Sequence, residues 1–105
     1  MKDLGEASYI LGIKILRDRK SRMLGLSQTS YIDKILSRYS MSDCKPTLIP
    51  FRHGVTLSKK MAPKSADEIE QMKRCPYASA VGSLMYAMLY TRPDICHVVG
   101  VVSRF

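Results

Sequence analysis

The sequence predicts an α+β fold, in which one antiparallel β-hairpin is followed by three to four α-helices. Two observations carry this prediction. Between residues 9 and 27, apolar side chains recur with the two-residue period of a strand. From residue 28 onward, they recur every three to four residues, which is the period of a helix packed by one face. A chain of 105 residues with 46% apolar content has the size and composition of one globular domain or of part of one.

The hairpin is expected to begin with a strand from Tyr9 to Arg17 and to return along a strand from Arg22 to Ser27. Its connection (residues 18–21) contains no Asn-Gly or Asp-Gly pair, which predicts a looser four-residue turn. Gly12 and Gly25 interrupt the strands, and either a bend or the close approach of a ligand accounts for them. One face of the first strand is expected to carry four larger apolar side chains: Tyr9, Leu11, Ile13 and Ile15.

The first helix is expected from Gln28 to Tyr39, with Ser27 as the residue whose hydroxyl caps it. Residues 40–64 are expected to form an extended connector. Prolines and a glycine recur in this segment, and its apolar residues show neither the spacing of a strand nor that of a helix. A capping-box pattern, Ser65 to Glu68, predicts a second helix that ends near Arg74.

Pro76 separates the second helix from an apolar segment, Tyr77 to Tyr90, which is expected to be helical. Thr91 is expected to cap a last helix, with Pro93 and Asp94 in its first turn. The expected domains are a hairpin with its helix (1–39), the connector (40–64) and a helical segment (65–105) that looks cut at its C-terminal end. The expected apolar stripe of the third helix comprises Tyr77, Val81, Leu84, Met85, Met88 and Leu89.

The chain is strongly basic, with 17 Lys and Arg against 9 Asp and Glu and a net charge of +8. The segment from Lys14 to Arg38 alone contributes +5 of this charge. Such a surplus either keeps a protein soluble or attracts an anionic partner, such as nucleic acid or an acidic membrane surface.

Several classes are disfavoured by composition. The three cysteines, Cys44, Cys75 and Cys96, are far apart and show no zinc-ligand spacing with His53 or His97, so we expect reduced thiols and no metal site. No signal peptide is expected, and the longest apolar stretch is too short to span a bilayer. We therefore expect an intracellular protein with no membrane partner.

Several segments, taken in order, resemble one known family. The chain is similar to the part of copia-type LTR-retrotransposon reverse transcriptases that follows the palm, and order and spacing are kept from Met1 to Phe105. The matching segments are Met1–Gly5, Tyr9–Ile15, Leu26–Gln28, Tyr31–Ile32, Tyr77–Met88, Thr91–Ile95 and Ser103–Phe105. The resemblance implies that this chain is a post-palm fragment of a longer Pol polyprotein.

The resemblance also implies what such a fragment contributes. The hairpin would be a primer grip, which holds the primer end, and the helices after it would be thumb- and connection-like. The catalytic aspartates that bind Mg²⁺ in the intact polymerase would lie in a missing palm, and the RNase H domain would also be missing. No Asp-Asp pair exists in this chain, so we expect no cofactor here and no polymerisation by the chain alone.

The expected partner is an RNA/DNA template–primer, bound by phosphate contacts and close backbone approach. A solvated hairpin is the alternative. For Lys34 and Arg38, phosphate contact and a plain solvated helix face explain the residues equally well, and Arg92 would pair with phosphate or with Asp94. The candidate binding residues are Gly12, Lys14, Arg17, Arg19, Lys20, Arg22, Gly25, Lys34 and Arg38.

A second hypothesis keeps the same residues but a different role. The chain would then be a freestanding, non-catalytic remnant of a transposon that binds nucleic acid or protein. Such a remnant must fold alone, whereas a piece of a polymerase would expose faces meant for its missing parts.

Overall fold

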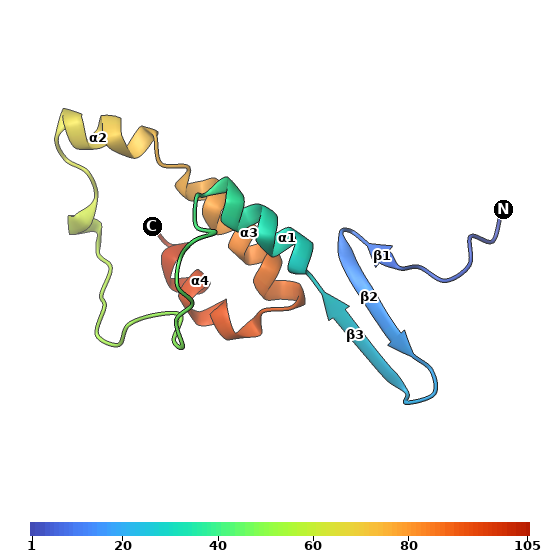
Figure 1. Cartoon of the computed structure of the whole chain (residues 1–105). Coiled ribbons are helices and arrows are strands. Elements are labelled where there is room, and N and C mark those ends of the chain that lie inside the picture. The colour runs from blue at the N-terminus through green and yellow to red at the C-terminus, as the bar shows by residue number, and fades with distance from the viewer. The chain divides into compact units, whose positions relative to one another are not determined.

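The computed structural model describes all 105 residues and confirms the α+β class. It divides into two compact units, Met1–Cys44 and Lys45–Phe105. The first unit contains an antiparallel sheet and one α-helix, and the second contains three α-helices (Figure 1).

The first unit has strands β1 (Tyr9–Ile10), β2 (Ile13–Asp18) and β3 (Met23–Ser27) in that spatial order, followed by α1 (Thr29–Arg38). The second unit contains α2, α3 and α4, with a single 3₁₀ turn before α2 and another before α4. Their bounds are Lys59–Met61 for the first 3₁₀ turn, Ala66–Lys73 for α2, Tyr77–Tyr90 for α3, Pro93–Ile95 for the second 3₁₀ turn and Cys96–Val102 for α4.

The predicted first strand is wrong at its middle, where the chain reverses instead of continuing. Leu11 and Gly12 have φ angles of 52° and 78°, so both lie in the left-handed region that type I′ turns require. Ile10 consequently pairs with Ile13, and the simple hairpin becomes a three-stranded sheet. Ile10, rather than Tyr9 or Leu11, therefore shares a sheet face with Ile13.

Replacing Gly12 with alanine should destabilise this turn, because a Cβ is strained at a φ of 78°. We expect a loss of about 1 kcal/mol in the free energy of unfolding, measured by urea titration with circular dichroism. Gly25→Ala is the matched control, since a Cβ there would meet the Leu16 Cβ at an ordinary 3.6 Å. Equal effects of the two substitutions would contradict the assigned turn.

Two predicted helix caps are displaced. The N-cap of α1 is Gln28 rather than Ser27, which ends β3, but the Ser27 hydroxyl accepts the expected hydrogen bond from an early helical amide, that of Thr29, at 3.5 Å. Thr91 is the C-cap of α3 rather than the N-cap of the next helix. Pro93 instead begins a 3₁₀ turn, because its fixed φ suits the first residue of any helical turn.

The capping box at the start of α2 is confirmed. The Ser65 hydroxyl accepts a hydrogen bond from the Glu68 amide at 3.2 Å. The Glu68 carboxylate accepts in return from the amides of Ser65 at 3.3 Å and of Lys64 at 2.9 Å. This reciprocal pair satisfies amide groups that have no partner inside the helix.

These bonds make α2 sensitive to acid. Hydrogen bonds from the Lys64 and Ser65 amides hold the pKa of Glu68 below its ordinary value of 4.5. A carboxyl with a lowered folded pKa stabilises the fold above its unfolded pKa, and the effect is lost as pH falls through the folded pKa. We expect the amide protons of Lys64 and Ser65 to exchange faster as pH is lowered below 4.5, after correction for intrinsic rates, measured by NMR. The Glu68→Gln variant should show no such step, and an identical pH profile in both proteins would contradict it.

The core of the second unit lies between α3 and α4. Val99 in α4 is 1% exposed, and Ala87 in α3 is 3% exposed. The Tyr77 hydroxyl also donates a hydrogen bond to the Val102 carbonyl, which ties the start of α3 to the end of α4. The predicted apolar stripe is therefore only partly correct, because Leu84, Met85 and Leu89 are exposed and the small Ala87 occupies the interior.

The two units together bury little apolar surface. Only four apolar side chains are buried: Ile13, Val81, Ala87 and Val99. The margin of stability of this chain alone is consequently small.

Candidate nucleic-acid interface

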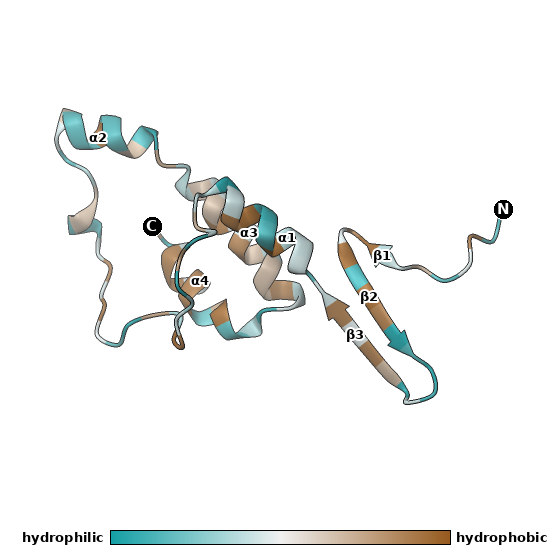
Figure 2. Ribbon diagram, in the orientation of Figure 1, coloured by the Kyte–Doolittle hydropathy of each residue, from teal (hydrophilic) through white to brown (hydrophobic).

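The tip of the β2–β3 hairpin gathers exposed cations. The loop of residues 19–22 joins the two strands, and Figure 2 shows it as a hydrophilic end on two largely apolar strands. Arg17 lies on β2 just before the loop, so three arginines and one lysine fall within six residues. All four side chains, of Arg17, Arg19, Lys20 and Arg22, are exposed.

Asp18 fixes the shape of this loop. Its carboxylate accepts hydrogen bonds from the Lys20 amide at 3.0 Å and the Ser21 amide at 3.3 Å. A hydrogen bond from the Ser21 side chain and these two amide bonds lower the pKa of Asp18. The loop closes at Arg22, which adopts a left-handed φ of 53°. The tip is thus a defined turn, which positions its cations before any partner binds.

One cation of the tip is already paired. Arg19 forms an ion pair with Glu6, and hydrogen bonding by Arg19 lowers the pKa of that carboxyl. Their side chains are 65% and 69% exposed, so salt screens the pair and it adds little stability. Arg17, Lys20 and Arg22 form no ion pair and remain available to an anion.

The arginines of the tip line one cleft of about 450 Å³. Arg17, Arg19 and Arg22 contribute its basic wall, and Met23 and Leu24 contribute an apolar wall. Asp18 also lines the cleft, with its carboxylate engaged by the amides of the loop. Guanidinium groups bind phosphate through paired N–H donors, so this cleft suits a sugar-phosphate backbone. Sequence reasoning missed Met23 and Leu24 because an exposed apolar residue on a strand carries no functional signal by itself.

The other predicted residues of the first unit are not part of this cleft. Lys14 lies opposite Tyr9 and Ser27, at the far end of β2 and on the face opposite to Arg17. Lys34 and Arg38 are exposed on α1, where Arg38 also suits the negative end of the helix dipole.

The two glycines have structural explanations. Gly12 occupies the left-handed position of the β1–β2 turn, and Gly25 lies opposite Leu16 with room for a side chain. Their predicted role in close backbone approach to nucleic acid stays a prediction.

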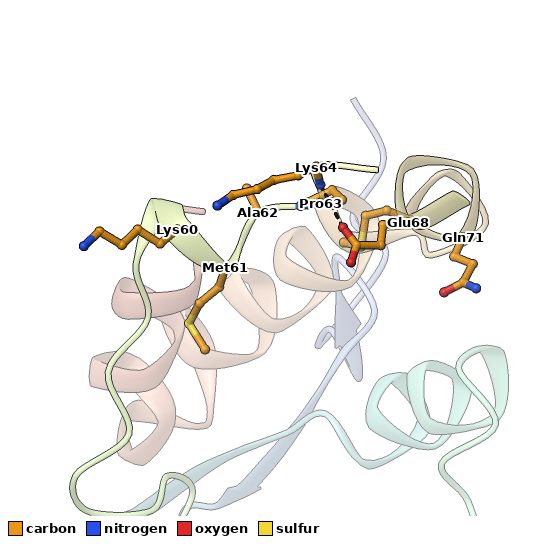
Figure 3. Close-up of a pocket in the computed structure, with 8 residues that line it drawn as sticks. Lys60, Met61, Ala62, Pro63, Lys64, Glu68 and Gln71 are labelled. Carbon is orange, nitrogen blue, oxygen red and sulfur yellow. Dashed lines mark hydrogen bonds between the residues drawn. The ribbon is translucent and has the colours of Figure 1, made fainter. Parts of the chain in front are cut away.

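The second unit carries its own basic surface. Residues 45–105 contain nine basic and four acidic residues, against eight and five in residues 1–44. Lys60 and Lys64 border a pocket of about 410 Å³ beside Glu68, whose carboxylate bonds the backbone of Lys64 (Figure 3). Net charge is therefore shared between the units, although the arginine-lined cleft belongs to the first.

Arg92 pairs with Asp94, one of the two predicted alternatives. Two hydrogen bonds, 2.9 Å from Nε and 2.8 Å from a terminal nitrogen, join the guanidinium to the carboxylate. These bonds raise the pKa of Arg92 and lower the pKa of Asp94. This ion pair links Arg92 and Asp94 at the 3₁₀ turn before α4, and it gives both residues a structural role.

The residues do not assemble the carboxylate set that the resemblance implies for the Mg²⁺ of a polymerase. No three His, Cys, Asp or Glu side chains come close enough together to hold a metal ion. All three cysteines are exposed thiols without a disulfide. None of the helices combines the length and apolar character needed to cross a membrane.

Comparison with known proteins matches the whole chain. It is 57% identical over 105 residues to a retrovirus-related Pol polyprotein from transposon TNT 1-94 of Nicotiana tabacum. It is 37% identical over 105 residues to the corresponding polyprotein from transposon RE1 of Arabidopsis thaliana. These homologues are retrotransposon Pol polyproteins. The chain spans 8% of the first Pol polyprotein and 6% of the second, and their names identify no domain within them.

Shorter relatives of the Pol polyproteins also match. The chain is 39% identical to an uncharacterized mitochondrial protein of Arabidopsis thaliana and spans 39% of it. It is 32% identical to a putative transposon Ty5-1 protein of Saccharomyces cerevisiae and spans 32% of that protein. No family model and no solved structure matches the chain.

Proposed function

We propose that this chain is a fragment of the RNA-directed DNA polymerase of a copia-type retrotransposon, and that it contributes template–primer binding without catalytic aspartates. The observation that carries the proposal is the cleft formed by Arg17, Arg19 and Arg22, in a chain that matches Pol polyproteins over its whole length. Nucleotidyl transfer would depend on carboxylates and Mg²⁺ in a palm supplied by the rest of the polyprotein.

The cleft suggests how binding would proceed. The guanidinium groups of Arg17 and Arg22 would neutralise consecutive phosphates, while Met23 and Leu24 would face the sugars. Because Asp18 holds the loop in shape, little conformational entropy is lost on binding. In this primer-grip role the hairpin positions the primer end, and α1 with Lys34 and Arg38 is thumb-like.

The proposed fragment would have further protein partners and a cellular location. The palm and RNase H portions of the polyprotein would adjoin this chain, and the assembly would act in a cytoplasmic particle or the nucleus. Contacts to phosphate carry no sequence information, so binding is expected to be non-specific.

Salt dependence tests the binding. A fluorescently labelled RNA/DNA primer–template should bind the full chain, and its affinity should fall steeply with salt in a fluorescence anisotropy titration. Neutralising three to four phosphates predicts a log–log slope of roughly −3. No binding at low salt, or binding unchanged at high salt, would contradict the proposed function.

A primer-extension assay tests the absence of chemistry. With deoxynucleotides and Mg²⁺ present, the chain alone should extend no primer that it binds. An intact reverse transcriptase serves as the positive control. Incorporation by this chain would show that it contains a complete active site, and the fragment proposal would then be wrong.

The freestanding remnant is the second candidate, and the shorter relatives favour it. The chain aligns with 39% of the uncharacterized mitochondrial protein of Arabidopsis thaliana, so related segments occur outside long polyproteins. Independent folding distinguishes a freestanding remnant from a fragment of a polymerase. A cooperative thermal transition of the isolated chain supports this candidate, and a flat, uncooperative melt contradicts it.

A further inference from the structure

A second concave site lies wholly within residues 45–105, apart from the hairpin cleft. It is a pocket of about 590 Å³ between the connector, the end of α2, the start of α3, and the residues at and after the end of α4. Its lining is predominantly apolar and comes from segments far apart in sequence, including Phe51, Leu57, Met61, Met72, Tyr77 and Phe105. A pocket of this size and lining accommodates one large apolar side chain of a partner.

Several of its apolar side chains face water in the chain alone. Met61 is 67% exposed, Phe105 is 52% exposed and Met72 is 40% exposed. Methionine side chains are flexible and polarizable, so they adapt to an inserted group. The Tyr77 hydroxyl is already bonded to the Val102 carbonyl and brings no unsatisfied donor into the pocket.

Four cations line this pocket or the one that adjoins it. Lys59 and Arg104 line the pocket itself, and Lys60 and Lys64 border the adjoining pocket that shares Met61 and Met72 with it (Figure 3). None of these four cations forms an ion pair. The only acidic side chain that lines either pocket is Glu68, and its carboxylate is engaged by backbone amides of the capping box.

We propose that this pocket docks an acidic peptide segment of a partner protein, with one aromatic or large aliphatic side chain inserted and carboxylates beside it on the lysines. Charge complementarity favours this occupant, because Lys59 lines the pocket, Lys60 and Lys64 line the adjoining one, and none of the three ammonium groups is in an ion pair. A nucleic-acid base fits less well, since its polar edges would meet the aliphatic walls of Leu57, Met61 and Met72 without hydrogen-bond partners.

The absence of tryptophan from the chain gives a direct test. The probe is a capped hexapeptide, Asp-Glu-Trp-Leu-Glu-Asp, added to the full chain at low salt. Insertion of its indole ring should shift the peptide's tryptophan emission to the blue in a saturable way. An unshifted emission spectrum at protein concentrations up to about 1 mM would overturn the proposal.

Matched variants locate the binding. Met72→Ser should weaken the peptide affinity roughly tenfold, because it removes an apolar wall. Ile69→Ser is the control on the same helix, since Ile69 is 42% exposed but does not line the pocket. Circular dichroism checks that both variants keep the helix content of the parent. Equal affinities of the two variants would overturn the assignment.

Competing peptides and nucleic acid test the chemistry without altering the protein. A phenylalanine version of the hexapeptide should displace the probe, whereas a serine version at that position should not. A version with Asn and Gln in place of its acids should bind at least tenfold more weakly at low salt. Equal binding of that neutral version would overturn the charge argument. Displacement of the probe by a deoxythymidine decamer, with the same loss in Met72→Ser, would assign the pocket to nucleic acid instead.

Discussion

Replacing Arg17, Lys20 and Arg22 with serine is expected to weaken binding of an RNA/DNA primer–template by roughly a hundredfold at low salt. These are the cations of the tip that form no ion pair, and Arg17 and Arg22 line its cleft. Because three phosphate contacts are lost, the log–log slope against salt should become shallower by about 2 to 3. Fluorescence anisotropy titrations at several salt concentrations measure both quantities.

The matched control removes the same charge from the second unit. Lys59, Lys60 and Lys64 changed together to serine lower the net charge by the same three units but leave the hairpin tip intact. We expect this variant to lose clearly less affinity. Adding Arg19→Ser to the tip variant should cost less than each of the other substitutions, because Arg19 is partly neutralised by Glu6. Equal losses in the two triple variants would mean that the tip has no special role.

Replacing Val99 with aspartate is expected to unfold the second unit. Val99 is 1% exposed in the interior of that unit, and burying an unpaired carboxylate there costs about 3 kcal/mol or more. The chain has few other buried apolar side chains with which to offset such a loss. We expect the helical signal at 222 nm to fall and any cooperative thermal transition to disappear.

His97→Asp is the control for this substitution. His97 lies on the same helix, α4, but is exposed, so its replacement adds a similar charge without burying it. The His97 variant should keep the circular dichroism spectrum of the parent. If Val99→Asp melts like His97→Asp, the α3–α4 packing described above is wrong.

Local chemistry made some elements predictable from the sequence. The Ser65 to Glu68 capping box specifies a helix start through two reciprocal hydrogen bonds, and α2 begins where that pattern places it. The third helix also matches its predicted range, since Pro76 bounds an apolar run of helical length. In both cases the information lies within a few residues, so no tertiary contact had to be known.

The turn between β1 and β2 was not predictable, because the alternation of apolar residues continues through it. The period of two runs from Tyr9 to Ile15 without a break, and it conceals the reversal at Leu11 and Gly12. A glycine after a bulky apolar residue does not distinguish a bend from a turn, and only the strand pairing decides. Thr91 likewise has a capping side chain, but the helix before it extends far enough to take it as a C-cap.

The candidate site also has some features that could be predicted from the sequence and others that could not. The cluster of cations at the hairpin tip follows directly from the sequence, because neighbours in a loop are neighbours in space. The ion pair between Arg19 and Glu6 does not, since it joins residues 13 apart. Met23 and Leu24 begin β3 directly after the loop, but their apolar side chains do not by themselves indicate that they line a cleft with the arginines.

The central claim is that the hairpin tip contacts the primer strand, and site-specific photocrosslinking tests it most directly. A benzophenone amino acid placed at Ser21 reports contacts at the tip, and the same group at Ser58 reports contacts in the second unit. With an end-labelled RNA/DNA primer–template, we predict crosslinking to the primer strand near its 3′ end from position 21, reduced by added salt, and much less from position 58. Crosslinking from position 58 alone, or to equal extents from both positions, would contradict the claim.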